Sequence, residues 1–264
     1  MRQALAILLC ASQCWGALTF SAASTNKVNC GSNAVLDNVT AGTMMVWYRP
    51  AAVNTYRAIT SKADTAYTAF HILSSNSSGN VRWQIKRATT SLNVASANSA
   101  IAINTWYFLA ATWDTAGAAP AVYRGTLSAT VADISSGSPT AGTGAVADDS
   151  GNSFLIGNDE PAASLSANGR IAFTHMTNYR MTLAELVAQQ FRPRVVAGTV
   201  FFAHFSQTAN FTDLSGNQNA CVVTGATVSD HVPIGPWFGL FDIRKFLRIP
   251  THEDPNTHDL IFAD

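Results

Sequence analysis

Charged side chains are scarce in this chain of 264 residues. Only 12% of the residues are charged, the formal net charge is zero, and the lysines and arginines form no run. Because binding to a phosphate backbone needs clustered positive side chains, we expect no nucleic-acid partner. The surface must instead be covered largely by Ser, Thr, Asn, Gly and Ala, a composition found in extracellular β-proteins and in virus structural proteins.

Glutamate is especially rare, since Glu160, Glu185 and Glu253 are the only three. Most glycosidases need two carboxyl groups that flank the scissile bond. No predicted strand carries two carboxylates at alternating positions. The chain also has no G-x-S-x-G nucleophile motif, and neither Cys30 nor Cys221 has a histidine near it in sequence. We therefore expect a protein that is not an enzyme.

Long apolar runs are absent as well, so we expect no membrane span. Residues 1–16 carry Arg2, a short apolar run and small residues, as a short secretory signal does. The alternative is a terminal segment that is retained and packs against a partner. The first reading predicts an extracellular, secreted protein, and the second suits a virion surface.

Four cysteines occur, of which Cys10 and Cys14 lie in this leader and Cys30 and Cys221 lie in the body. If the protein is exported, Cys30 and Cys221 could form a disulfide that constrains a long loop by a few kcal/mol. Two separate buried thiols are the alternative.

What the chain does have is many short strands. Residues 43–50 and 104–114 are apolar on both faces, as in strands inside a sandwich. Residues 81–86 alternate, which predicts a strand with one face exposed to water. We expect another strand over residues 121–127 with a hairpin turn at Gly125, and a long surface loop over residues 135–152.

One short helix is predicted after residue 181. Thr182 and Glu185 form a capping box at its start, and Pro193 follows its end. Apolar residues then recur at spacings of three and four, which predicts one apolar face made by Leu183, Leu186, Val187 and Phe191.

With these segments identified, the chain resembles the concanavalin A-like jelly-roll superfamily, in particular its laminin G-like and pentraxin-like domains. The resemblance lies in NTWYFLAATWD followed by VYRGTL, in FLIGND, and in GRIAFTHMTNYRMTLAEL. It covers residues 17–235 and implies an all-β fold, a two-sheet antiparallel jelly-roll sandwich with one short helix. The leader (1–16) and an apolar tail (236–264) lie outside it.

The resemblance also implies a possible calcium cofactor, because such domains often bind Ca²⁺ through loop oxygens. The candidate ligands flank the FLIGND segment and are Asp148, Asp149, Asn158, Asp159 and Glu160. The chain departs from its relatives where Ala172 replaces a common acidic residue. The alternative is that these side chains cap turns.

Aromatic side chains are the usual platforms for sugars. The patterns place Trp47, Trp83, Trp106 and Trp113 in the core. Tyrosines near strand ends are better placed to line a groove, and we take as ligand-binding candidates Tyr56, Tyr67 and Tyr179.

The tail is strongly apolar and is expected to dock on its own domain or on a partner through Trp237, Phe238, Phe241 and Phe246. The resulting hypothesis is a non-catalytic, lectin-like recognition or attachment module with a carbohydrate-type ligand, whose partner is a glycan or a protein. The alternative is a virion structural protein, such as a capsid decoration or appendage subunit, which forms a homo-oligomer or virion assembly through the tail.

Overall fold

The fold is described from a computed structural model over residues 16–232, except residues 24, 69, 118, 160–164, 206–208 and 231. The chain divides into a unit of Met1–Ile234, which contains every described residue, and a unit of Gly235–Asp264, which lies outside them. Within the described ranges, no helix could span a bilayer.

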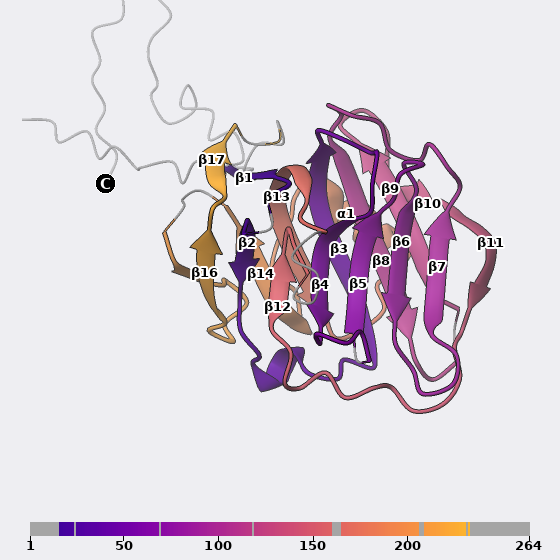
Figure 1. The fold of residues 1–264 in the computed structure, drawn as a ribbon. Helices are drawn as coiled ribbons and strands as arrows, with labels where there is room; N and C mark the ends of the chain where they lie inside the picture. The colour runs from indigo at the N-terminus through magenta and orange to yellow at the C-terminus, as the bar shows by residue number, and fades with distance from the viewer. Residues whose placement is uncertain are drawn as a thin grey trace, which may run out of the picture. The chain divides into compact units, whose positions relative to one another are not determined.

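The described strands form two sheets in which every pairing between strands is antiparallel, and these sheets lie face to face (Figure 1). One sheet has the order β10 (Ala132–Asp133), β9 (Ala121–Thr126), β8 (Tyr107–Asp114), β3 (Ala41–Pro50), β13 (Asn168–Thr177), β1 (Ala17–Ser21) and β17 (Thr227–Ser229), with β14 (Thr199–His204) also paired to β13.

The second sheet has the order β11 (Ser135–Thr140), β7 (Leu92–Ser96), β6 (Val81–Ile85), β5 (Phe70–Ser75), β4 (Arg57–Ala63), β12 (Phe154–Ile156), β2 (Lys27–Asn29), β16 (Ala220–Thr224) and β15 (Phe211–Thr212). A short 3-10 helix, η1 (Ala34–Leu36), and one α-helix, α1 (Leu183–Gln190), complete the described elements. The predicted two-sheet antiparallel sandwich with one short helix is confirmed.

The main core lies between the two sheets. Trp83 on β6 stacks on Trp113 on β8 with ring centroids 4.5 Å apart, which joins one sheet to the other. The alternation predicted for β6 is confirmed, because its three apolar side chains are buried and its two polar ones are half-buried. All four tryptophans that the patterns assign to the core are buried.

A second apolar cluster covers the outer face of the eight-stranded sheet and explains why β3 and β8 are apolar on both faces. Met45, Phe108 and Phe173 pack there against Leu186 of α1. Trp47 belongs to this cluster and donates a hydrogen bond from Nε1 to the carbonyl oxygen of Gln190 at 2.8 Å. The helix is thus held on the sheet by packing and by this buried hydrogen bond, to which the Gln190 side chain adds others.

The capping box of α1 is confirmed, but its predicted apolar face is wrong. Leu183, Val187 and Phe191 are 46%, 38% and 37% exposed, whereas Leu186, Gln189 and Gln190 are buried. Gln190 can be buried because its side-chain amide is satisfied. Its Nε2 donates to the carbonyls of Thr126 and Ala129 at 2.7 and 2.8 Å, and its Oε1 accepts from the amide of Val131 at 2.7 Å.

Two predictions about the segment from residue 121 to residue 152 are corrected. Gly125 lies within β9, opposite Phe108, and the turn follows Thr126. A Cβ atom at Gly125 would lie 2.5 Å from Nε2 of Gln190, so the glycine makes room for the glutamine. The expected surface loop contains β11, which pairs with β7.

Cys30 and Cys221 form a disulfide with an S–S distance of 2.11 Å. The bond lies beside the pairing of β2 with β16, in which Asn29 is opposite Val222. It links positions 191 residues apart, so it ties the beginning of the sandwich to its end.

Candidate binding pocket beside the helix

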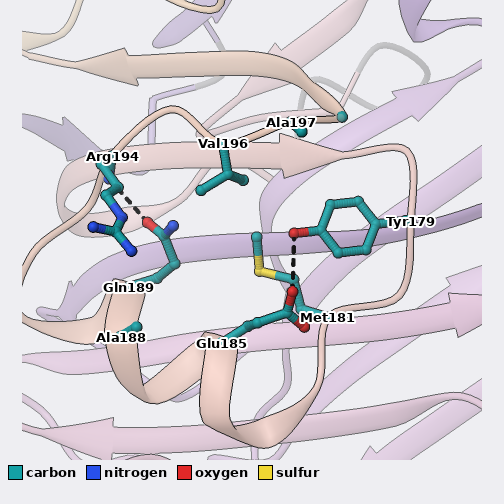
Figure 2. A pocket seen from close by; sticks show the side chains of 9 residues that line it. Tyr179, Met181, Glu185, Ala188, Gln189, Arg194, Val196 and Ala197 are labelled. Carbon is teal, nitrogen blue, oxygen red and sulfur yellow. Dashed lines mark hydrogen bonds between the residues drawn. The ribbon is translucent and has the colours of Figure 1, made fainter.

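A cavity of about 550 Å³ lies between α1 and the segment 194–198 (Figure 2). Its lining combines an aromatic ring, apolar side chains and charged groups of both signs. The lining residues are Tyr179, Met181, Glu185, Ala188, Gln189, Arg194, Val196, Ala197 and Gly198. Of the three tyrosines predicted to bind ligand, Tyr179 lines this pocket.

The backbone around Tyr179 is held by neighbouring strands. Its carbonyl oxygen accepts hydrogen bonds from the hydroxyls of Thr43 and Thr177 at 2.9 and 2.8 Å. The amide of Asn178 donates to the carbonyl of Gly198 at 2.9 Å. Gly198 has a φ of 80°, and a Cβ atom there would lie 2.8 Å from Cδ1 of Tyr179. The ring therefore lies against the backbone of the 194–198 segment.

Glu185 supplies a fixed negative charge on the same side of the pocket. Its carboxylate accepts from the amide of Thr182 at 2.7 Å, and this capping bond lowers the pKa of Glu185. The hydroxyl of Tyr179 donates to the other carboxylate oxygen at 3.3 Å. Burial, together with the Glu185 charge, raises the pKa of Tyr179. Near neutral pH the pair is therefore a carboxylate and a neutral phenol.

Gln189 and Arg194 lie on the opposite side of the pocket, with Val196 between them and Tyr179 (Figure 2). The backbone amide of Arg194 donates to Oε1 of Gln189 at 2.9 Å, which fixes the start of the segment against the helix. The side chain of Arg194 is exposed. The pocket thus has a hydrogen-bond acceptor at one wall and a cationic donor at the other.

This arrangement suits a ligand with several hydroxyl groups. A sugar hydroxyl can donate to a carboxylate and accept from a guanidinium, while the apolar face of the ring contacts an aromatic side chain. Among the lining residues, Glu185 is the single carboxylate, and its oxygens are engaged by the helix cap and by Tyr179.

The other two candidate tyrosines lie elsewhere. Tyr56 is 41% exposed, and its hydroxyl accepts from Nη1 of Arg82 at 2.9 Å. Arg82 also donates to the side-chain oxygen of Asn93 at 2.8 Å, so these three side chains form a polar cluster near β6 and β7. Tyr67 donates to a carboxylate oxygen of Asp159, and burial raises its pKa. The structure does not bring the three tyrosines together.

The first two calcium candidates stabilise a rim of the sandwich through protein partners. Asp149 pairs with the buried amine of Lys62 at 2.9 Å and accepts from the amide of Asn38 at 2.8 Å. Lys62 also pairs with Asp37 at 2.8 Å. Asp148 accepts from the side chain of Asn38 at 2.9 Å. The hydrogen bonds from Asn38 and Ser150 lower the pKa of Asp148 to about 2.

The other calcium candidates follow β12 and contact different segments. Asn158 donates to the carbonyl of Asn26 at 3.1 Å, and Asp159 accepts from Tyr67. Glu160 lies outside the described residues. Over the described ranges, no three His, Cys, Asp or Glu side chains are grouped to hold a metal. The four described candidates do not fit a calcium site by themselves, and calcium binding stays a prediction.

Several residues that line the pocket could not be found from the sequence. Gln189 and Arg194 carry no motif, and Gly198 reads only as a turn residue. The one sequence signal that could have indicated them is their position at and just after the end of the capped helix that follows Tyr179. A short connection after a helix keeps the chain near the same surface. The tail residues predicted to dock, Trp237, Phe238, Phe241 and Phe246, lie outside the described residues.

A laminin G-type family model, described as the concanavalin A-like lectin/glucanases superfamily, matches residues 22–187, which is more than half of the chain. The chain belongs to this superfamily. The resemblance read from the sequence is thereby confirmed. No curated protein sequence matches the chain.

Solved structures share the fold of this superfamily domain at low identity. A Bacteroides ovatus protein inferred to bind carbohydrate is 13% identical with a TM-score of 0.57, and the alignment covers 84% of this chain but 61% of that protein. The heptameric SAP-like pentraxin of Limulus polyphemus is 12% identical with a TM-score of 0.56, covering 84% and 98%. The enzymatically active domain of tailspike protein 2 of bacteriophage CBA120 is 9% identical with a TM-score of 0.52, covering 71% and 29%.

Proposed function

We propose that this domain is a non-catalytic recognition module that binds a carbohydrate-type ligand in the pocket beside α1. The observation that carries the proposal is the cavity of about 550 Å³, with Tyr179 and Glu185 on one side and Arg194 on the opposite side. Its volume is within the range of small-molecule sites. The Bacteroides ovatus protein of similar fold is inferred to bind carbohydrate, which agrees with this ligand class.

The absence of catalysis is part of the proposal. Hydrolysis of a glycosidic bond by the usual mechanisms needs an acid and a second carboxylate at a set distance. Glu185 is held ionised by the Thr182 cap, which makes it a poor proton donor. We also propose an extracellular location, because the Cys30–Cys221 disulfide suits an oxidising compartment.

The first test is a glycan array probed with the full chain, followed by calorimetry with the best glycan. We expect Tyr179→Ala and Arg194→Ala to weaken that binding by about tenfold or more, because each removes one wall of the pocket. Tyr56→Ala is the matched control, since that tyrosine lies outside the pocket, and it should bind as the unchanged protein does.

Two results would refute this proposal. The array could show no glycan binding by the full chain, or both pocket variants could bind as tightly as the Tyr56→Ala control. Thermal unfolding of each variant separates a lost contact from a lost fold. Arg194→Ala is informative even if Tyr179→Ala unfolds, because the Arg194 side chain is exposed.

A second candidate function is a virion appendage or decoration subunit. Two features favour it: the fold shared with the phage tailspike domain and the apolar residues Trp237, Phe238, Phe241 and Phe246. This candidate predicts a large assembly by light scattering that becomes a folded monomer when residues 237–264 are deleted. A monomeric full chain, or a deletion variant that unfolds, would contradict it.

A further inference from the structure

A second cavity, of about 330 Å³, lies where β1, β3 and β13 meet near the first residues of β13. Two arginines line it, Arg49 from β3 and Arg170 from β13, together with Thr19 and Asn104. It has no residue in common with the pocket beside α1, so an inference about it does not depend on the proposed function.

The strand register explains why these arginines are neighbours. Arg170 is directly opposite Arg49 on one side and opposite Thr19 on the other. The flanking residues Tyr48 and Ile171 face the main core, so alternation along the strands directs both arginines to the outer face of the sheet. Like charges directly opposite on adjacent antiparallel strands destabilise the pairing.

Little among the described side chains offsets this repulsion. Over the described residues, the acidic partner of the pair is Asp230, whose carboxylate lies 3.7 Å from Nη1 of Arg170. The Asp230 side chain is 98% exposed, so its contribution is small. Arg49 donates from Nε to the carbonyl of Asn104 at 2.9 Å. That bond orients the guanidinium, but a carbonyl oxygen carries no net charge to offset the positive charge.

We propose that this arginine pair binds one sulfate group in the cavity between β1, β3 and β13. The planar fork of a guanidinium can donate paired hydrogen bonds to two oxygens of such a group. Thr19 and Asn104, which also line the cavity, carry neutral polar groups suited to the rest of such a ligand. The sulfate is either carried by a sulfated sugar or is a free ion. Binding of the sulfated sugar and of free sulfate distinguishes these two sources.

The test is calorimetry of the full chain at low ionic strength with three probes: sodium sulfate, a sulfated disaccharide and the same disaccharide without sulfate. We expect saturable binding of a sulfated probe and none of the unsulfated one. Tighter binding of the sulfated sugar than of sulfate identifies a sugar-borne group, whereas equal binding identifies a free-anion site.

Arg49→Gln and Arg170→Gln should each weaken this binding about tenfold or more. Arg82→Gln is the matched control, because Arg82 is a half-buried arginine on the other sheet. Arg170→Gln should also raise the melting temperature at low salt, since it relieves the repulsion. Absence of binding to both sulfated probes, or equal weakening by all three variants, would overturn the proposal.

Discussion

At the scale of single residues, Gly198 determines how closely the backbone approaches the Tyr179 ring in the pocket beside α1. Its φ of 80° is one that L side chains rarely adopt, and its missing Cβ leaves room for the Tyr179 ring and for Oδ1 of Asn178, 2.6 Å from where that Cβ would lie. The position of the aromatic wall therefore depends on a residue that cannot touch the ligand with a side chain of its own.

Gly198→Ala should destabilise the fold by about 2 kcal/mol or more and weaken the proposed glycan binding, because it adds a clash with Tyr179 to the backbone strain. Gly216→Ala is the matched control. Gly216 has a φ of 90° and open space around its missing Cβ, so its variant carries the strain alone. Urea unfolding and calorimetry of both variants measure the difference, and equal effects would show that Tyr179 does not depend on Gly198.

Two buried histidines make stability depend on pH. Burial lowers the pKa of His71 to about 4 and that of His175 to about 3. The unfolded chain takes up these protons near pH 6.5, so between about pH 6.5 and pH 4 it binds more protons than the folded chain does. Stability is therefore full above about pH 6.5 and falls as the pH is lowered through this window.

We expect the free energy of unfolding to fall by about 2–3 kcal/mol for each of these histidines between about pH 7 and pH 4.5. Urea unfolding at the two pH values measures the change. His71→Gln with His175→Gln should lower stability at both pH values but reduce the difference between them. If the double variant keeps the full difference, the histidines are not its source.

At the scale of elements, α1 shows how a local pattern can predict the start of a helix but not its buried face. The capping box needs only Thr182 and Glu185, which are three residues apart and can be recognised in the sequence. The burial of Gln190 depends on groups of the hairpin between β9 and β10, about 60 residues earlier in the chain. The contact of Gln190 with this hairpin determines which face of α1 packs on the sheet. Leu183 and Val187 lie on the other side and are therefore exposed.

Gln190→Leu should therefore destabilise the protein by about 2–4 kcal/mol, although it places an apolar residue in a buried position. The change removes the acceptor for the Val131 amide and the donor for the carbonyls of Thr126 and Ala129. Val187→Ala, on the exposed side of the helix, should change stability by less than about 1 kcal/mol. Urea unfolding that ranked the two the other way would contradict this account.

At the scale of the whole molecule, the disulfide joins the two ends of the described sandwich. Reduction, or Cys30→Ser with Cys221→Ser, should lower the free energy of unfolding by about 2–5 kcal/mol, because the unfolded chain regains the freedom of a long loop. Denaturant unfolding with and without reductant measures this. A double-serine variant as stable as the oxidised protein would contradict it.

The class of fold is predictable from the sequence, whereas the candidate site largely is not. β6 alternates between apolar and polar residues, and β3 and β8 are apolar on both faces. These local patterns indicate a sandwich and can be recognised without knowing the order of the strands. The pocket depends on where Arg194 and Gly198 return beside the helix, and the arginine cavity depends on the register between β3 and β13. No local sequence pattern predicts either the return of this segment beside the helix or the register of the two strands.

The pairing of β1 with β17 determines how the domain would respond to tension. Ala17 is opposite Ser229, so a pull between these residues would separate β17 from β1 one hydrogen bond at a time, which is the mechanically weak geometry. Separation would stop at the disulfide, and the load would then pass directly from Cys30 to Cys221. The covalent chain between the two cysteines, which includes β3, β13 and the pocket beside α1, would then not be stretched.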